Sequence, residues 1–240
     1  MKLDILAFGS HPDDVELGCG ATVAKEVASG KKVGIIDLTR GELGTRGTAE
    51  IRDKEANEAA KVLGVSIREN MEFADGFFVN DKAHQLEIIK MIRKYRPEIV
   101  LCNAIDDRHI DHGKGSKLVS DACFLSGLVK IDTKEDGGDE WQKPWRPKLV
   151  YHYIQWKNIE PDFVVNVTGF IEKKSAAIKT YASQFYDPNS KEPETPITSK
   201  NFIDSIHYRA RDLGRLIGTE YAEGFTVERP VAVECLDDLI

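Results

Sequence analysis

Short apolar runs alternate with longer stretches in which apolar residues recur every three or four positions. The runs have the length and continuity of buried strands, and they cover residues 3–10, 32–39, 67–73 and 99–103. The stretches between them predict three helices, one ending near residue 27, one over 48–63 and one over 81–96. Because a helix separates each pair of successive strands, the pattern predicts parallel strands.

The pattern beyond residue 113 is less regular. Helices are expected over 113–130, 171–181 and 201–217, strands over 149–154 and 163–167, and a loop with three prolines over 186–199. The whole pattern predicts an α/β fold, a Rossmann-like, doubly wound and mostly parallel sheet in the order 3-2-1-4-5 plus additional C-terminal strands, with helices on both faces. Since no repeat or linker divides the chain, residues 1–240 are expected to form a single domain.

Composition narrows the class of protein. The chain has 240 residues, of which 41% are hydrophobic and 30% charged, and this ordinary balance excludes intrinsic disorder. A net charge of −7 gives no general attraction to nucleic acid or to an anionic membrane. No apolar run reaches the ~18 residues of a membrane span, and no secretory signal is recognisable, so we expect a cytoplasmic protein. The four cysteines form no CxxC pair, which indicates reduced thiols.

The segment His11-Pro12-Asp13-Asp14 stands where the first strand ends and a helix begins. In open α/β sheets, ligands bind outside the carboxyl ends of the strands, so an imidazole and two carboxylates are expected at the rim where substrates enter. The competing interpretation makes one aspartate a helix N-cap and His11 an ordinary turn residue.

A second polar cluster follows the fourth strand. It contains Asp106, Asp107 and Arg108, and then His109-Ile110-Asp111-His112-Gly113, in which two histidines three positions apart enclose an aspartate. The alternative to a functional site is a solvated polar loop with one capping aspartate.

The expected strand order places strands 1 and 4 side by side, so both clusters are predicted to share one crevice at the switch point of the sheet. Their side chains offer imidazole and carboxylate without thiolate. Two histidines and one aspartate with an open fourth position are typical of a catalytic zinc site, and we select His11, Asp14 and His112 as ligands. Asp13 and His109 then remain free beside the metal, and Asp111 is placed to orient a histidine.

These motifs resemble the PIG-L/LmbE-like family of zinc-dependent N-acetylglucosamine deacetylases, and within it the bacillithiol-biosynthesis branch. The resemblance rests on the HPDD segment at residues 11–14 and on residues 108–113, and it extends to segments 4–8, 30–34, 37–39 and 209–225. One departure is Ile110, where the family usually has proline.

The resemblance implies zinc, or another divalent ion such as Fe²⁺, at His11, Asp14 and His112. It also implies that Asp13 is the general base and that His109 stabilises the oxyanion or protonates the amine. These assignments agree with the ligands selected from spacing.

The resemblance further implies a site for an anionic aglycone, a malate. Arg52 and Arg108 are the expected carboxylate-binding residues, because a guanidinium binds a carboxylate through two hydrogen bonds. Tyr186 is a candidate for the substrate entrance. The alternatives are that the arginines are solvated charges and that Tyr186 anchors a long loop.

The function implied is hydrolysis of the acetamide of an N-acetylglucosamine conjugate, most specifically N-acetylglucosaminyl-malate in bacillithiol synthesis. Another N-acetyl sugar, or a mycothiol-type or bacillithiol-S-conjugate amide, is the alternative substrate. The family also implies a homo-oligomer, commonly a hexamer. A non-catalytic nucleotide- or sugar-binding module is the alternative of another class. It is disfavoured because the turn after the first strand lacks G-x-G-x-x-G and the acid–base residues are all present.

Overall fold

A seven-stranded sheet organises the computed structural model, which describes residues 1–135 and 137–238. The strands lie in the order β3-β2-β1-β4-β5-β7-β6. Their bounds are β1 Ile5–Gly9, β2 Val33–Thr39, β3 Ile67–Phe73, β4 Ile99–Cys102, β5 Leu149–Tyr153, β6 Phe163–Asn166 and β7 Ala222–Val227. Strands β1 to β5 pair in parallel, whereas β7 runs antiparallel to both β5 and β6.

The predicted fold class and the order 3-2-1-4-5 are confirmed. Strand β7 was not predicted as a strand. Its sequence, Ala-Glu-Gly-Phe-Thr-Val, contains a charged residue and a glycine and so lacks the apolar run that marks the other strands. Glu223 is nevertheless buried, because its carboxylate accepts a hydrogen bond from Lys174 Nζ at 2.6 Å.

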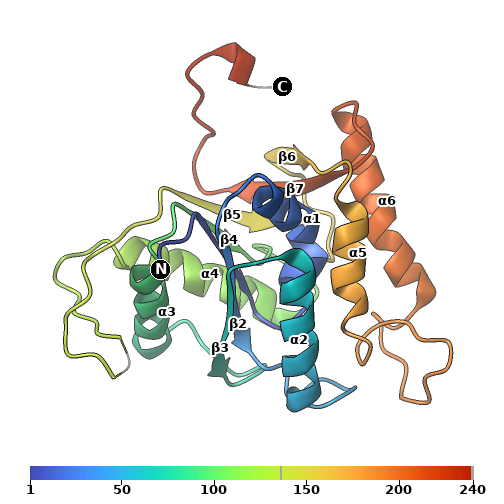
Figure 1. The fold of residues 1–240 in the computed structure, drawn as a ribbon, viewed down its shortest axis with the longest axis horizontal. Helices are drawn as coiled ribbons and strands as arrows, with labels where there is room; N and C mark the ends of the chain where they lie inside the picture. Colours follow the sequence, from blue (N-terminus) through green and yellow to red (C-terminus); the bar gives the residue numbers. More distant parts are fainter. Residues whose placement is uncertain (136, 239–240) are drawn as a thin grey trace.

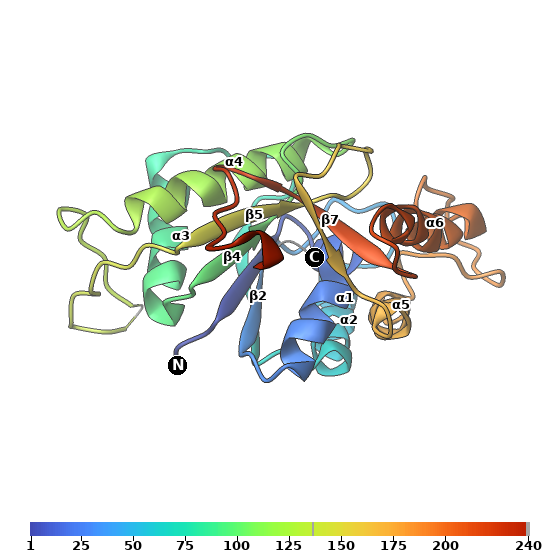
Figure 2. The same cartoon turned by 90° about the horizontal axis from the view of Figure 1, so that it is seen from above.

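The helices form layers on the two faces of the sheet. Helices α3 and α4 cover one face, and α1, α2 and α5 cover the other, while α6 packs against β7 at the side (Figures 1 and 2). Their bounds are α1 Asp14–Ala28, α2 Ala49–Leu63, α3 Lys82–Tyr95, α4 Ile110–Leu125, α5 Ile171–Lys179 and α6 Lys200–Leu216, followed by a short 3₁₀ helix at Leu236–Asp238. None of the helices in the described residues has the length and apolar character needed to cross a membrane.

Alternation along the central strands divides the core into two parts. On β1, Ile5 and Ala7 face the cluster under α1, α2 and α5, whereas Leu6 and Phe8 face the cluster under α3 and α4. Both faces of the strand are buried, as is usual for parallel sheets covered by helices. The polar ends of β1 and β4 are therefore held by a rigid, fully packed sheet.

Candidate active site

The two polar clusters converge at the carboxyl ends of β1 and β4. Ser10, directly after β1, donates its backbone N–H to Asn103 Oδ1 at 2.8 Å, and its hydroxyl lies 2.9 Å from the carbonyl oxygen of Asp111. Asn103 directly follows β4, and Asp111 is in the first turn of α4. Ser10 thus fastens the first cluster to the second, as the strand order predicted.

Asp14 lies between two imidazoles. Its Oδ1 is 3.1 Å from His112 Nε2, and its Oδ2 is 3.5 Å from His11 Nδ1. The carboxylate also accepts hydrogen bonds of 2.9 Å from Asn103 Nδ2 and from Gln155 Nε2. These contacts hold the buried Asp14 side chain in one orientation.

A carboxylate contacts the other nitrogen of each imidazole. His112 Nδ1 is 2.6 Å from Asp107 Oδ2, and His11 Nε2 is 3.0 Å from Asp75 Oδ1. Because an ionised carboxylate only accepts hydrogen bonds, these nitrogens carry the protons. In the neutral imidazoles the remaining lone pairs then face Asp14, and only a proton or a cation between them relieves the repulsion. The residues therefore fit a divalent cation.

The surrounding carboxylates also shift the pKa values of His11 and His112 upward. Burial lowers the pKa of His112, but the charge of Asp14 and the hydrogen bonds to Asp107 and Asp14 outweigh it and raise that pKa to about 9. The pKa of His11 is also raised: burial opposes the shift, and hydrogen bonds to Asp111, Asp14 and Asp75 outweigh it. The site therefore attracts positive charge.

In the described residues, two groups of three side chains each bring their ligand atoms within 4.8 Å of one another. One group is His11, His109 and His112, and the other is His11, Asp75 and Asp111. The trio selected from the sequence, with Asp14 as its carboxylate, is not among them. Asp14 approaches the two histidines through different oxygens, so the three side chains contact in pairs. His109 is the alternative third ligand that this geometry offers.

Asp13 has an unusual backbone conformation. It stands at the N-cap position of α1 with φ 113°, and its side chain makes no capping hydrogen bond. Instead its carboxylate accepts a hydrogen bond of 2.8 Å from Arg52 Nη2, and the same guanidinium also contacts the carbonyl oxygen of Pro12. Burial raises the pKa of Asp13 to about 7, against the opposing charge of Arg52. The carboxylate faces the cavity instead of capping the helix.

His109 caps the start of α4, which begins three residues earlier than expected. Its Nδ1 accepts a hydrogen bond of 3.3 Å from the backbone N–H of Asp111, which satisfies one free donor of the first turn. Burial and the charges of His11 and His112 lower the pKa of His109. The neutral ring therefore carries its proton on Nε2.

Asp111 is fully buried beneath this turn. Its Oδ2 accepts a hydrogen bond of 2.7 Å from the backbone N–H of Gly76 and lies 3.4 Å from His11 Nε2. Its Oδ1 accepts a hydrogen bond of 3.1 Å from Lys114 Nζ. Asp111 thus contacts His11 but not the cavity.

The family profile described as "PIG-L: GlcNAc-PI de-N-acetylase" matches residues 6–123, a segment that contains both polar clusters. The solved structure of the conserved protein TT1542 from Thermus thermophilus is 35% identical, superposes with a TM-score of 0.86, and each chain covers 98% of the other. Over residues 6–123 the chain belongs to the PIG-L family.

Curated relatives of this PIG-L chain include two proteins named for amide hydrolysis. Diacetylchitobiose deacetylase of Thermococcus kodakarensis is 29% identical over 232 residues, which cover 92% of this chain and 81% of that protein. Mycothiol S-conjugate amidase of Streptomyces coelicolor is 28% identical over 184 residues, which cover 63% of this chain and 60% of that protein.

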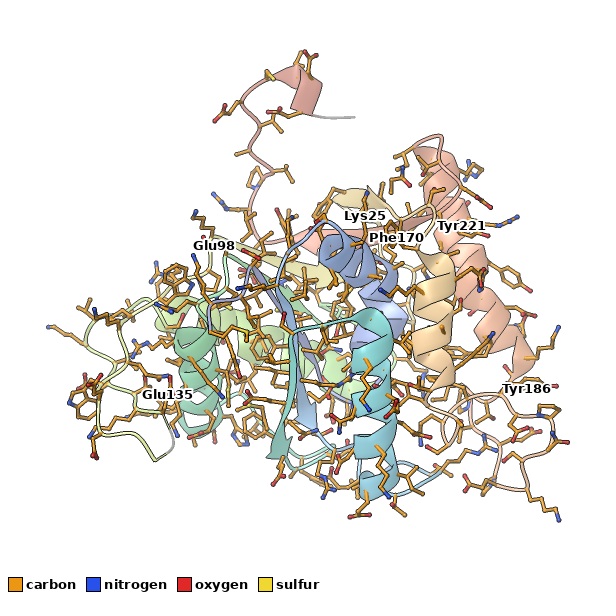
Figure 3. The ribbon with its side chains drawn as sticks, viewed as in Figure 1. Lys25, Glu98, Glu135, Phe170, Tyr186 and Tyr221 are labelled. Atoms are coloured by element: carbon orange, nitrogen blue, oxygen red, sulfur yellow. The ribbon has the colours of Figure 1, made fainter. Side chains whose placement is uncertain are left out.

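The PIG-L site opens into a cavity of about 1110 Å³. Arg52 and Arg108 both line it, but they differ in their contacts. Arg52 is buried and engaged with Asp13, whereas Arg108 is exposed and lies over the ring of Trp156, 4.7 Å from its centroid. Tyr186 is not among the lining residues; its half-exposed side chain lies at the edge of the molecule, on the loop before α6 (Figure 3).

Several polar groups of this PIG-L site were not predicted from the sequence, notably Asp75, Asp107, Asn103 and Gln155. Asp75 follows β3 and Asn103 follows β4, so their positions at strand ends are the signal that was available. Gln155 follows β5 in the same way. No motif surrounds Asp75 or Gln155, and their contacts with His11 and Asp14 appear only in three dimensions.

Proposed function

We propose that this chain is a divalent-metal-dependent deacetylase that hydrolyses the acetamide of an N-acetylglucosamine conjugate. The observation that carries the proposal is the buried carboxylate of Asp14 between imidazole nitrogens of His11 and His112, with Asp13 beside it. The relatives named as a deacetylase and an S-conjugate amidase support the same class of reaction.

In this proposal His11, Asp14 and His112 hold the ion, Zn²⁺ or Fe²⁺. When bound, a divalent cation polarises a carbonyl group and lowers the pKa of water toward neutrality. Imidazole and carboxylate ligands without thiolate suit both metals.

The chain's own residues move the proton. Asp13 accepts a proton from a water molecule as the water oxygen bonds to the acetamide carbon, and His109 donates its Nε2–H to the developing oxyanion. When the C–N bond breaks, Asp13 returns the proton to the nitrogen, so the products are acetate and an amine. Arg52 holds the Asp13 carboxylate in place throughout. Of the two roles expected for His109, oxyanion stabilisation suits its lowered pKa better than protonation of the amine.

The finer proposal is that the substrate is N-acetylglucosaminyl-malate. Within the described residues, Arg108 has no carboxylate within ion-pair distance, and it lies at the cavity beside Trp156. A guanidinium in that position suits a carboxylate of the aglycone. The cation–π contact with the ring of Trp156 helps to hold the guanidinium in place.

The test is acetate release from N-acetylglucosaminyl-malate, diacetylchitobiose and a mycothiol-type conjugate, with and without a chelator. We expect acetate and amine in equal amounts, loss of turnover on chelation and recovery with Zn²⁺. The Arg108→Gln variant is expected to raise KM for the malate conjugate more than for diacetylchitobiose. Absence of acetate from every substrate contradicts the proposed reaction, and faster turnover of a neutral conjugate contradicts the malate assignment alone.

A further inference from the structure

Asp75 connects a histidine of the cation site to a loop at the cavity rim. Its Oδ1 lies 3.0 Å from His11 Nε2, and its Oδ2 accepts a hydrogen bond of 3.0 Å from the backbone N–H of Leu43. Leu43 belongs to the glycine-rich loop 40–47, and it lines the cavity. The contact is reinforced in the other direction, because the backbone N–H of Asp75 donates to Glu42 Oε1 at 2.8 Å.

Asp107 makes the equivalent connection on the other side of the site. Its Oδ2 lies 2.6 Å from His112 Nδ1, and its Oδ1 accepts a hydrogen bond of 2.8 Å from the backbone N–H of Lys157. The N–H of Trp156 lies 3.3 Å from Oδ2. Residues 154–161 form the rim segment that carries Trp156. Each of the two carboxylates therefore contacts its own histidine and its own rim loop.

We infer that Asp75 and Asp107 are positioning residues that couple binding of the cation to the order of the two rim loops. The inference rests on the proposed function in one respect, that the cation binds at His11 and His112. Each carboxylate accepts a hydrogen bond from the N–H of its histidine, which leaves the lone pair of the other ring nitrogen directed toward the ion. A bound ion holds the imidazole, the imidazole holds the carboxylate, and the carboxylate holds the loop.

This coupling is reciprocal. If an ordered rim loop strengthens ion binding, then ion binding favours the ordered loop by the same free energy. Zn²⁺ alone is therefore expected to slow hydrogen exchange at the backbone N–H groups of Leu43 and Lys157, in the full chain without substrate. This measurement needs no variant. Unchanged exchange at both groups on saturation with Zn²⁺ overturns the inference.

Variants at Asp107 separate its contact with His112 from its contacts with the rim loop. Asp107→Ala removes all of these contacts. We expect Zn²⁺ affinity, measured by titration calorimetry on the metal-free chain, to fall about 10–100-fold while exchange at Lys157 becomes faster. Asp107→Asn keeps a single acceptor oxygen, which serves either His112 or Lys157, so one of the two readouts is expected to change. An Asp107→Ala variant with parental affinity and parental exchange overturns the role of Asp107.

The neighbouring Asp106 supplies the matched control. Its side chain is 69% exposed and pairs with Lys157 Nζ at 2.7 Å, but it contacts no histidine. Asp106→Asn is expected to keep parental Zn²⁺ affinity and parental exchange at Lys157. Thermal unfolding and circular dichroism of each variant check the fold, and Asp75→Asn provides a second test if Asp107→Ala does not fold.

Failure of this inference is distinguishable from failure of the proposed function. Normal acetate release without any Zn²⁺-dependent loop protection overturns the coupling and leaves the deacetylase proposal in place. Zn²⁺-dependent protection without acetate release from any conjugate does the reverse. A parent chain that binds no Zn²⁺ overturns both.

Discussion

Asp13 adopts a backbone conformation that a side chain rarely tolerates, with φ 113°. Such a conformation costs about 1–3 kcal/mol, and it persists only where surrounding contacts impose it. Here the bond from Arg52 and the turn at Pro12 supply those contacts. The strained turn directs the carboxylate into the cavity instead of over the end of α1.

Asp13→Asn tests the proposed role of this carboxylate. Asparagine tolerates positive φ and has nearly the same shape, but it cannot accept the water proton. We expect kcat for acetate release to fall about 10²–10⁴-fold while Zn²⁺ affinity stays within a few-fold of the parent. Parental turnover in this variant contradicts the assignment of the base.

His109→Gln distinguishes two roles for His109. If the ring is an oxyanion donor, kcat is expected to fall about 10²–10³-fold with Zn²⁺ affinity unchanged. If His109 is the third ligand in place of Asp14, Zn²⁺ affinity falls as well. We expect the first result, because His109 Nδ1 already accepts the N–H of Asp111. Calorimetry with Zn²⁺ alone, alongside steady-state kinetics, gives the answer.

At the level of single residues, the sequence pointed to those site residues that lie inside recognisable motifs. His11, Asp14 and His112 were placed together because their strands are neighbours in the sheet. The direction of a long side chain was not predictable in this way: Arg52 turns toward Asp13, and Tyr186 stays outside the cavity. Asp75 was missed because a carboxylate after a strand has no distinguishing pattern without its contact to His11.

Helix α1 approaches β5 closely. A Cβ atom added at Gly18 would overlap the ring of Tyr153, whose hydroxyl donates to the carbonyl oxygen of Phe8 at 2.8 Å. After Cys19, where the helix bends, the Glu223 carboxylate accepts the N–H groups of Ala21 and Thr22 at 3.2 and 2.7 Å. These contacts fix the helix whose first residue is Asp14.

Gly18→Ala is therefore expected to destabilise the fold. The free energy of unfolding is predicted to fall by about 1–3 kcal/mol, because Tyr153 must leave its packed position. Gly20→Ala is the control, since its Cβ would lie no closer than 3.3 Å to any neighbour, that neighbour being Lys174 Cγ, and 3.8 Å from the carbonyl oxygen of Val15. Denaturant unfolding of both variants measures the difference, and equal stabilities contradict the packing argument.

At the scale of elements, periodicity and capping residues predicted most boundaries. Thr48 is the N-cap of α2 and Asp81 the N-cap of α3, and each accepts a backbone N–H through its side chain. Helix α4 begins earlier than expected because His109 is its cap, a residue type seldom found there. Strand β7 was not predicted because Glu223 is buried through an ion pair with Lys174 of α5, which is distant in the sequence.

For the whole molecule, the cation site concentrates negative charge in the protein interior. A ligand that binds only the folded state stabilises it by about 2.7 kcal/mol at 100 times its Kd. For a chain of this size, that corresponds to a rise in Tm of roughly 5–10 °C. We therefore expect Zn²⁺ to raise Tm and a chelator to reverse it, as measured by differential scanning calorimetry. An unchanged Tm at saturating Zn²⁺ contradicts a cation site in the folded chain.

The order of the first five strands was predictable, because alternating strands and helices make parallel crossovers and the usual doubly wound sheet has the order 3-2-1-4-5. The order of the C-terminal strands was not predictable, because the last strand, β7, inserts between the earlier strands β5 and β6. The likeness to the Thermus structure over 98% of the chain agrees with this arrangement. The expected homo-oligomer stays a prediction, which sedimentation would test.

The late insertion of β7 affects how the protein is made. In the described residues β6 pairs with β7 alone, so β6 has no partner strand while a ribosome translates residues 167–221. At about 5–20 residues per second, a nascent chain then leaves one edge of β5 and the whole of β6 unpaired for several seconds. Chaperone capture during translation is expected to peak in that interval and to end once residue 227 has emerged.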